Sequence, residues 1–205
     1  MLAGPARALA EGLAPLLPFG QRLALANLWL LGPVLERVYA GAPTTAALVR
    51  TTQAVTMLQA GTKENVLPQS ARAVVNLRLL PGDTLAFATA RVKQVIDDPR
   101  VQVRPLGDFS SDPSAESSMT SPAFRLLEKS VRESFPDAAV APSLVLGATD
   151  ARLYAGLGAD TYRFAPLRFG PADLSRVHGT DERLAVSALG EAIRFYARLI
   201  RNAEP

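Results

Sequence analysis

A chain of 205 residues with 48% hydrophobic side chains is long enough to bury one substantial core or two small ones. Its 22 basic and 19 acidic residues give a formal charge of +3, and because the Lys and Arg residues are scattered with no basic cluster among aromatic residues, we expect no nucleic-acid partner. The absence of cysteine excludes disulfides and thiolate metal sites, so any zinc must be held by His and carboxylate groups.

The N-terminal segment shows neither a targeting signal nor a membrane span. Arg7 lies inside its apolar stretch and Glu11 follows, which is not the basic-then-apolar order of a signal peptide. The most apolar run, residues 23–35, is shorter than the roughly 20 residues that span a bilayer, and Asn27 and Gly32-Pro33 interrupt it. We therefore expect no membrane span, but a helix that is buried or faces a partner. The compartment stays open, and is cytoplasmic if the start of the chain is genuine.

The first half of the chain predicts helices followed by strands. Apolar residues recur at helical spacing over residues 5–17 and 21–39, with Pro and Gly breakers after each segment. Residues 51–60 are rich in Thr, Val and Gln, which favours a strand. Polar and apolar residues alternate along residues 72–79, the period of a half-exposed antiparallel strand.

A helix and a short strand complete this half. The turn at residues 81–84 starts a helical pattern that Asp98-Pro99 stops, and residues 101–104 favour a strand. This order fits a small α+β sandwich with helices on one face of an antiparallel sheet. Residues 108–122, rich in Ser, Pro and Asp, predict a linker between two domains.

Beyond the linker, helical and strand patterns alternate. We predict helices over residues 124–135, 150–157 and 186–200, and strands over residues 140–146 and 161–164. Alternation of this kind indicates an α/β layer. So few strands would make a very narrow sheet, so this half looks incomplete alone.

Three segments carry side chains that suit binding or catalysis. His178 is the single histidine in the chain, and a zinc site needs three or four ligands. The alternative to a role as a metal ligand is therefore an ordinary surface or structural role. The segment from Gly147 to Arg152 leads from a strand end into a helix, a place where α/β sheets bind ligands, although an N-cap and a surface arginine explain it equally well. The loop at residues 61–68, which contains Asn65, would otherwise be an ordinary hairpin loop.

Taken in order, these segments resemble the aminoacylase, carboxypeptidase and acetylornithine-deacetylase family of zinc metallohydrolases, metallopeptidase family twenty. The nearest similarity is to its carboxypeptidase-S and N-fatty-acyl-amino-acid synthase/hydrolase branch, and it covers nearly the whole chain. Each motif alone is moderately specific, but five in the right order are strong. The matching stretches are RTTQAVTMLQAGTKENVLP (residues 50–68), AVVNLRLLPGDT (73–84), LVLGATDARLY (144–154), YRFAPL (162–167) and HGTDERL (178–184).

The resemblance implies a two-domain enzyme in which a lid, often a dimerisation domain, is inserted into an α/β catalytic domain that binds two zinc ions. Residues 1–107 would be the later part of the lid and residues 108–122 the linker. Residues 123–205 would be the C-terminal portion of the catalytic domain. The implied class is thus α/β, with an α+β sandwich lid and part of a zinc-peptidase-like domain. A homodimer through the lid is also implied.

The same resemblance assigns roles to four residues. His178 matches a zinc ligand, Arg152 the arginine that faces the substrate carboxylate, and Asn65 the lid asparagine that reaches the active site. Gly147 lies beside the substrate. These roles agree with the chemistry, because neutral imidazole suits zinc and guanidinium is a planar two-pronged donor. The family's H-x-D segment, its Glu-Glu pair with the general base, a further acidic ligand and a lid histidine are not found in the chain, so no catalytic residue is assigned.

The sequence therefore predicts part of a zinc-dependent hydrolase that cleaves the amide bond of N-acyl amino acids or of peptides with a free carboxylate. With one zinc ligand and a carboxylate clamp, this chain alone should be inactive. Two departures from the branch, Asp181 in place of Asn and Leu153 in place of His, leave the substrate fit open. The acyl group, the amino acid and the native metal are not predicted. The alternative is a non-catalytic dimerisation or interaction module derived from such an enzyme.

Overall fold

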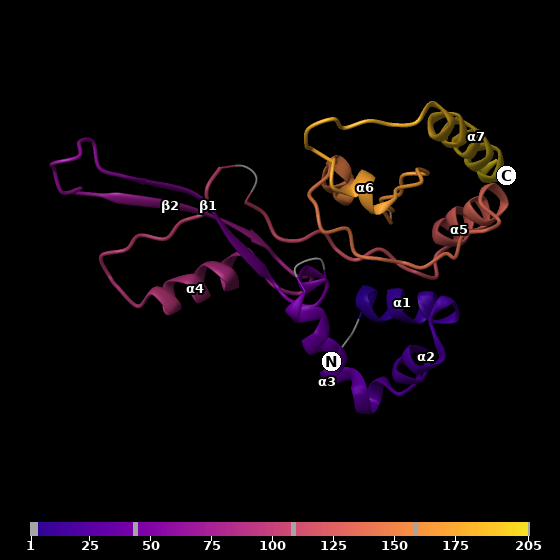
Figure 1. The fold of residues 1–205 in the computed structure, drawn as a ribbon, viewed down its shortest axis with the longest axis horizontal. Coiled ribbons are helices and arrows are strands. Elements are labelled where there is room, and N and C mark those ends of the chain that lie inside the picture. The colour runs from indigo at the N-terminus through magenta and orange to yellow at the C-terminus, as the bar shows by residue number, and fades with distance from the viewer. Residues whose placement is uncertain (1–3, 43–44, 108–109, 158–159, 205) are drawn as a thin grey trace.

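A computed structural model describes residues 4–42, 45–107, 110–157 and 160–204 of the chain. Figure 1 shows three N-terminal helices, a projecting hairpin with a helix alongside it, and a C-terminal group of helices and loops. This mixture of helices and strands confirms the fold class expected from the sequence. The elements are α1 (Gly4–Leu13), η1 (Ala14–Leu16), α2 (Phe19–Ala26), α3 (Leu28–Gly41), η2 (Ala46–Leu48), β1 (Thr52–Ala60), β2 (Ala71–Arg78), α4 (Leu85–Ile96), α5 (Pro122–Ser134), η3 (Asp150–Leu157), α6 (Pro171–Leu174) and α7 (Val186–Ala203).

The second predicted helix is present but is broken at Asn27. Residues 21–39 form two helices, α2 and α3, that meet at this residue. The Asn27 side chain donates to the carbonyl of Leu23 at 2.8 Å, and its own carbonyl accepts from the backbone N–H of Leu31 at 2.8 Å. Asn27 therefore closes one helix and opens the next, because its short amide competes with the backbone for hydrogen bonds.

The two predicted central strands form an antiparallel hairpin. β1 and β2 pair along their whole length, with a bulge between Val55 and Met57. In the part of the chain that the structure describes, the sheet contains only these two strands, so each has an edge with no neighbour. The strand predicted at residues 101–104 is wrong, because these residues form no ladder with any other described segment.

Helix α4 forms where the sequence predicts it. Thr84 caps the helix, its Oγ1 accepting a hydrogen bond from the backbone N–H of Phe87 at 3.1 Å, and Asp97 ends it in the left-handed region with φ of 47°. The helix runs alongside the hairpin (Figure 1). A hydrogen bond from the hydroxyl of Thr51 to Asp83 ties the start of β1 to the turn before α4.

Two separate clusters of buried apolar side chains hold the helices together. In the first, the buried residues Ala6 and Leu28 are surrounded by Leu25, Leu35, Tyr39, Leu48 and Val49. In the second, the buried residues Val131, Phe135 and Phe195 are surrounded by Leu127, Ala138, Val140 and Leu199, and this cluster joins α5 to α7. Both helices lie where the sequence predicts them.

The two strands predicted in the second half are wrong. Residues 140–146 and 161–164 form no ladder with the other described residues, and residues 150–157 form a 3-10 rather than an α-helix. A side chain from the predicted linker takes the place of a partner strand: the Ser117 hydroxyl accepts from the Thr161 N–H at 2.9 Å and donates to its carbonyl at 3.0 Å. An apolar run becomes a strand only when another strand satisfies its backbone groups.

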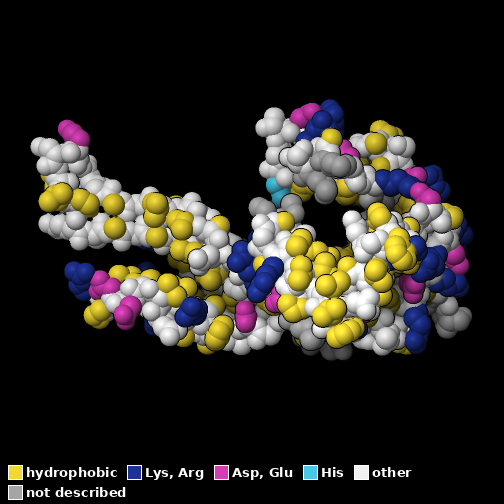
Figure 2. All heavy atoms as spheres, turned by 60° about the horizontal axis from the view of Figure 1, so that its bottom comes forward, with side chains coloured by type: hydrophobic (Ala, Val, Ile, Leu, Met, Phe, Trp, Pro, Cys, Tyr) yellow, Lys and Arg dark blue, Asp and Glu magenta, His cyan; other side chains and the backbone are white. Residues whose placement is uncertain are grey.

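The fold leaves much apolar surface exposed. Its accessible surface is 15218 Å², whereas a compact monomer of its 21.8 kDa mass exposes about 9,300 Å². Hydrophobic side chains run along the projecting hairpin and also gather on the larger body (Figure 2). Leu58 in β1 of the hairpin is 76% exposed, and Trp29 in α3 is 75% exposed. None of the described helices is both long and apolar enough to cross a bilayer. The exposed apolar faces therefore need cover from another protein surface or a ligand.

Candidate functional site

A tight turn after α6 presents His178 to solvent. The residue is exposed, visible in cyan in Figure 2, and its backbone is left-handed with φ of 59°. The Gly179 N–H donates to the carbonyl of Arg176 at 2.8 Å, and a Cβ at Gly179 would lie 3.3 Å from the same oxygen. The turn therefore favours glycine after the histidine, and it fixes the direction in which the imidazole leaves the backbone.

Two of the carboxylates next to this turn already have cationic partners. Asp173 accepts from the Gly170 N–H at 2.9 Å and lies 3.7 Å from Arg176, while Asp181 lies 3.0 Å from Arg183. In the described segments no group of three or more His, Asp or Glu residues is placed to hold a metal ion. One imidazole cannot form a zinc site, so these residues by themselves do not fit zinc, and we derive no chemical step through it.

The segment that begins at Gly147 is a bend followed by η3. Gly147 is exposed, and a Cβ there would meet no atom within 4 Å, so the backbone is open to a ligand. Thr149 organises the turn, accepting from the Ala151 N–H at its hydroxyl (3.3 Å) and from the Arg152 N–H at its carbonyl (3.2 Å). The Arg152 side chain is exposed on η3. The expected passage from strand to helix is thus replaced by an irregular segment and a 3-10 helix.

Asn65 lies far from this segment. It is exposed in the loop at residues 61–70, which joins the outer ends of β1 and β2. At the other end of β2, Arg78 donates to the carbonyl of Leu146 at 2.8 Å, next to Gly147. The eight residues of β2 span about 27 Å, so the structure of one chain does not bring Asn65 and Gly147 together.

An ionic cluster that the sequence analysis missed ties the second half together. Arg168 lies 2.8 Å from Asp137 and 3.4 Å from Glu191, and its guanidinium stands over the ring of Phe135 at 5.3 Å. Hydrogen bonding to this guanidinium is the main reason why the pKa of Asp137 lies below its ordinary value. No local signal predicts the cluster, because its members come from three segments far apart in sequence.

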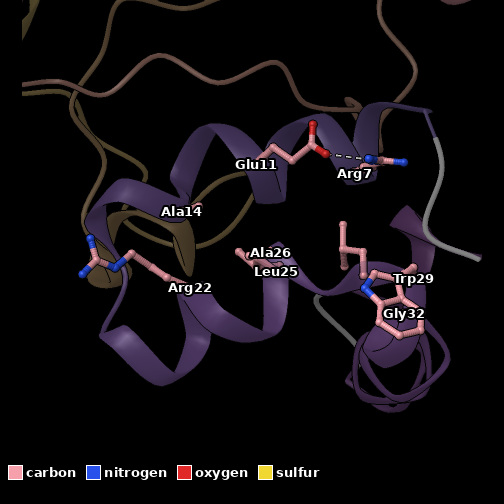
Figure 3. A pocket seen from close by; sticks show the side chains of 9 residues that line it. Arg7, Glu11, Ala14, Arg22, Leu25, Ala26, Trp29 and Gly32 are labelled. Atoms are coloured by element: carbon pink, nitrogen blue, oxygen red, sulfur yellow. Dashed lines mark hydrogen bonds and ion pairs between the residues drawn. The ribbon is translucent and has the colours of Figure 1, made fainter.

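A cavity between the N-terminal helices was also missed. It has a volume of about 440 Å³ and is lined by residues of α1, η1, α2 and α3 (Figure 3). The sequence analysis recognised the apolar run at residues 23–35 but had no means of locating a cavity, because its walls meet only after the break at Asn27. Its lining residues are Arg7, Glu11, Ala14, Arg22, Leu25, Ala26, Leu28, Trp29 and Gly32.

Comparison with known proteins identifies relatives over most of the chain. Residues 13–104 match the model of the peptidase dimerisation domain. The chain is 40% identical over 183 residues to the probable carboxypeptidase S-like 2 of Dictyostelium discoideum, covering 89% of this chain and 35% of that protein. It is 37% identical to an N-fatty-acyl-amino acid synthase/hydrolase of Danio rerio (98% of this chain, 39% of that protein) and 36% identical to one of Homo sapiens (95% and 39%). The chain thus spans under half the length of these relatives.

Proposed function

Because the chain is related to the carboxypeptidase S-like proteins and N-fatty-acyl-amino acid synthase/hydrolases of metallopeptidase family twenty, we propose that it is the C-terminal part of a hydrolase that cleaves amide bonds. The observation that carries the proposal is the extent of the match. The alignment to the Danio rerio relative covers 98% of the chain, so it continues past the dimerisation domain into the half that carries Arg152 and His178. The proposed substrates are N-acyl amino acids or peptides with a free carboxylate.

Arg152 and Gly147 would hold the substrate. The Arg152 guanidinium is exposed and can offer two parallel N–H donors to a carboxylate, a geometry that a lysine cannot reproduce. Gly147 has open space where a side chain would be, which lets a substrate approach the backbone. Gly147 lies in the bend before η3 and Arg152 lies within η3, so one short turn would set their spacing.

His178 would contribute one zinc ligand to a site that the rest of the enzyme completes. His178 is exposed in a turn with a left-handed backbone, so its imidazole is accessible to a metal ion. This chain's part would be to fix the imidazole and the substrate carboxylate, and alone it should not hydrolyse amides.

A homodimer follows from the position of Asn65. The length of β2, about 27 Å, separates the loop of Asn65 from Arg78, the residue that contacts Leu146 beside Gly147. Asn65 can therefore assist the substrate site only if it reaches a second subunit. The free strand edges and the exposed Leu58 and Val55 give the hairpin surfaces that a partner could cover. The match of residues 13–104 to a dimerisation domain supports this arrangement.

Complementation in the complete protein tests the proposal. Asn65→Ala and Arg152→Ala variants are each expected to hydrolyse an N-acyl amino acid poorly. Mixed and allowed to exchange subunits, half of the dimers become heterodimers with one unaltered site, and about one quarter of the normal activity returns. No recovery, with subunit exchange verified by mass, would contradict the shared site.

A second candidate is a non-catalytic dimerisation module derived from such an enzyme. The large exposed apolar surface favours it, because that surface suits assembly whether or not chemistry follows. The coding sequence ahead of residue 1 separates the two. An H-x-D segment and a Glu-Glu pair there support the enzyme, whereas a promoter and a genuine start support the module.

A further inference from the structure

Helix α7 carries apolar side chains on two separate faces. Ala188, Ala192 and Phe195 share one face, which is buried on the side of α5, the helix beside it in Figure 1. By helical spacing, a second face of α7 is turned away from this one, and we call it the outer face. Its five large side chains are exposed, from 46% for Tyr196 to 86% for Val186. They are Val186, Leu189, Ile193, Tyr196 and Ile200.

The charged side chains of α7 are confined to the strip between these two faces. A helix at the surface of a protein normally has one apolar stripe and a broad polar side. The polar side of α7 is narrow, and the outer face contains no charge. The helix therefore has the pattern of one that is covered on two sides, although α5 covers only one of them. The polar strip consists of Ser187, Glu191, Arg194, Arg198 and Arg201.

A glycine within the outer face indicates close contact with another backbone. Gly190 lies one turn from both Val186 and Ile193 on the same side of the helix. Glycine inside a helix lowers its stability relative to alanine. Outside the helix backbone, a Cβ at this position would meet only the guanidinium of Arg194, at an ordinary distance of 3.6 Å. The described chain thus gives no steric reason for the glycine, whereas a segment packed closely on α7 would.

Two segments beside α7 lack strand partners. Residues 140–146 and 161–164 have the side chains of strands but form no ladder with the other described residues. Val140 packs against the cluster that contains Phe195, and the ring of Phe164 lies 5.1 Å from the ring of Phe195. Backbone groups in such apolar segments need hydrogen-bond partners. Strands that paired with these two segments would therefore lie next to α7.

We propose that the outer face of α7 packs against a β-sheet contributed by the remainder of the proposed hydrolase. The inference rests on the proposed function, because the Danio rerio relative that matches 98% of this chain is more than twice as long. From Val186 to Ile200 the outer face is about 21 Å long, close to the 17–20 Å of a common strand. A second copy of α7 is a poorer partner. It would cover the outer face but leave residues 140–146 and 161–164 without strands to pair with.

The absence of cysteine from this chain allows the outer face to be probed with single thiols. Ile193→Cys places a thiol on the outer face, and Arg194→Cys places the control on the polar strip one residue along. Both positions are exposed in this chain, so both thiols should react with a maleimide at similar rates. In the complete protein, the thiol of Ile193→Cys should react at least about tenfold more slowly, while that of Arg194→Cys keeps its rate. Mass spectrometry of the labelled peptides identifies the site that reacted.

Gly190→Leu tests the close approach of the partner. Leucine is a better helix former than glycine, so this variant should raise the Tm of the chain alone by about 2–4 °C. In the complete protein the same side chain would enter the contact with the sheet, and the Tm should fall. A rise of Tm in both would overturn the proposal.

The labelling has two further outcomes that would overturn it. One is equal reactivity of Ile193→Cys and Arg194→Cys in the complete protein. The other is slow reaction of Ile193→Cys in this chain alone, the result expected if a second copy covers α7. Hydrolysis of an N-acyl amino acid by the unaltered complete protein is measured separately. Activity without protection rejects this contact and leaves the proposed function standing, whereas protection without activity supports the contact and rejects the catalytic role.

Discussion

The ring of Phe195 on α7 stacks on the ring of Phe135 at the end of α5, with centroids 6.1 Å apart and planes 26° from parallel. Phe195 is completely buried, and Phe164 also packs on it with ring centroids 5.1 Å apart. This ring therefore joins three segments that no sheet connects. Phe195→Ala is expected to lower the free energy of unfolding by about 3–5 kcal/mol. Ile193→Ala, two residues away on α7 and 61% exposed, should cost about 0.5 kcal/mol or less when both variants are unfolded in urea.

The ion pair between Arg168 and Asp137 predicts a pH dependence of stability. Hydrogen bonding to Arg168 lowers the pKa of Asp137 below its ordinary value of 3.8 in the folded chain. A carboxyl group with a depressed folded pKa contributes stability above pH 3.8 and loses it as the pH falls through the folded pKa. The Tm of Asp137→Asn should therefore lie below that of the unaltered chain at pH 6, and the two should converge near pH 2. A constant difference over this range would show that the pair contributes through packing alone.

Local signals predicted the elements whose hydrogen bonds are local. Helix α4 lies where the Thr84 cap and the apolar spacing place it, and the hairpin strands lie where residue types and alternation place them. The strands predicted at residues 101–104, 140–146 and 161–164 failed for the opposite reason. A strand forms only when another strand pairs with it, and a short stretch of sequence does not show which segments will lie beside it in the fold.

The same limit explains what the sequence analysis missed at the candidate sites. It singled out Asn65, Gly147, Arg152 and His178 by motif, but the distance from Asn65 to Gly147 appears only when the hairpin is extended in space. The cavity of Arg22 and Trp29 depends on the break at Asn27. The sequence showed Asn27 as an interruption of the apolar run at residues 23–35, but the helical pattern predicted one helix across it. Individual side chains could be recognised as candidate site residues from the sequence, but the residues that lie next to them in the fold could not.

A single histidine predicts weak zinc binding by this chain. His178 has no neighbouring group of His, Asp or Glu residues that could complete a site within the described residues, so water must fill the remaining coordination positions. Calorimetric titration should show zinc affinity weaker than micromolar, and His178→Ala should reduce it further. A submicromolar affinity that disappears in His178→Ala would reveal a site built from ligands not yet identified.

Arg152→Lys tests the proposed clamp in the complete enzyme. A lysine keeps the charge but not the planar pair of donors, so kcat/KM for a free-acid substrate should fall by about tenfold or more. The methyl ester of the same substrate offers no carboxylate, and its turnover should hardly change. Equal losses on the acid and the ester would assign Arg152 a structural role.

Three apolar side chains of α3 predict part of the subunit interface. Leu30, Val34 and Val38 recur every four residues on one face of the helix and are 59%, 54% and 59% exposed, an unfavourable arrangement unless a partner covers them. Leu30→Glu should convert a dimer to a monomer in sedimentation equilibrium while leaving the helical circular dichroism unchanged. Gln21→Glu introduces the same charge at an exposed position of α2 and should leave the mass unaltered.

The matched change at Leu28, which is only 8% exposed, separates assembly from folding. Leu28 belongs to the cluster that contains Ala6, so Leu28→Glu places a charge in an apolar core and should unfold the N-terminal helices. If Leu30→Glu also loses helical signal, the side chain of Leu30 supports the fold of its own chain. If Leu30→Glu stays folded with an unchanged mass, the dimer forms elsewhere, and the free edges of β1 and β2 become the remaining surface for it.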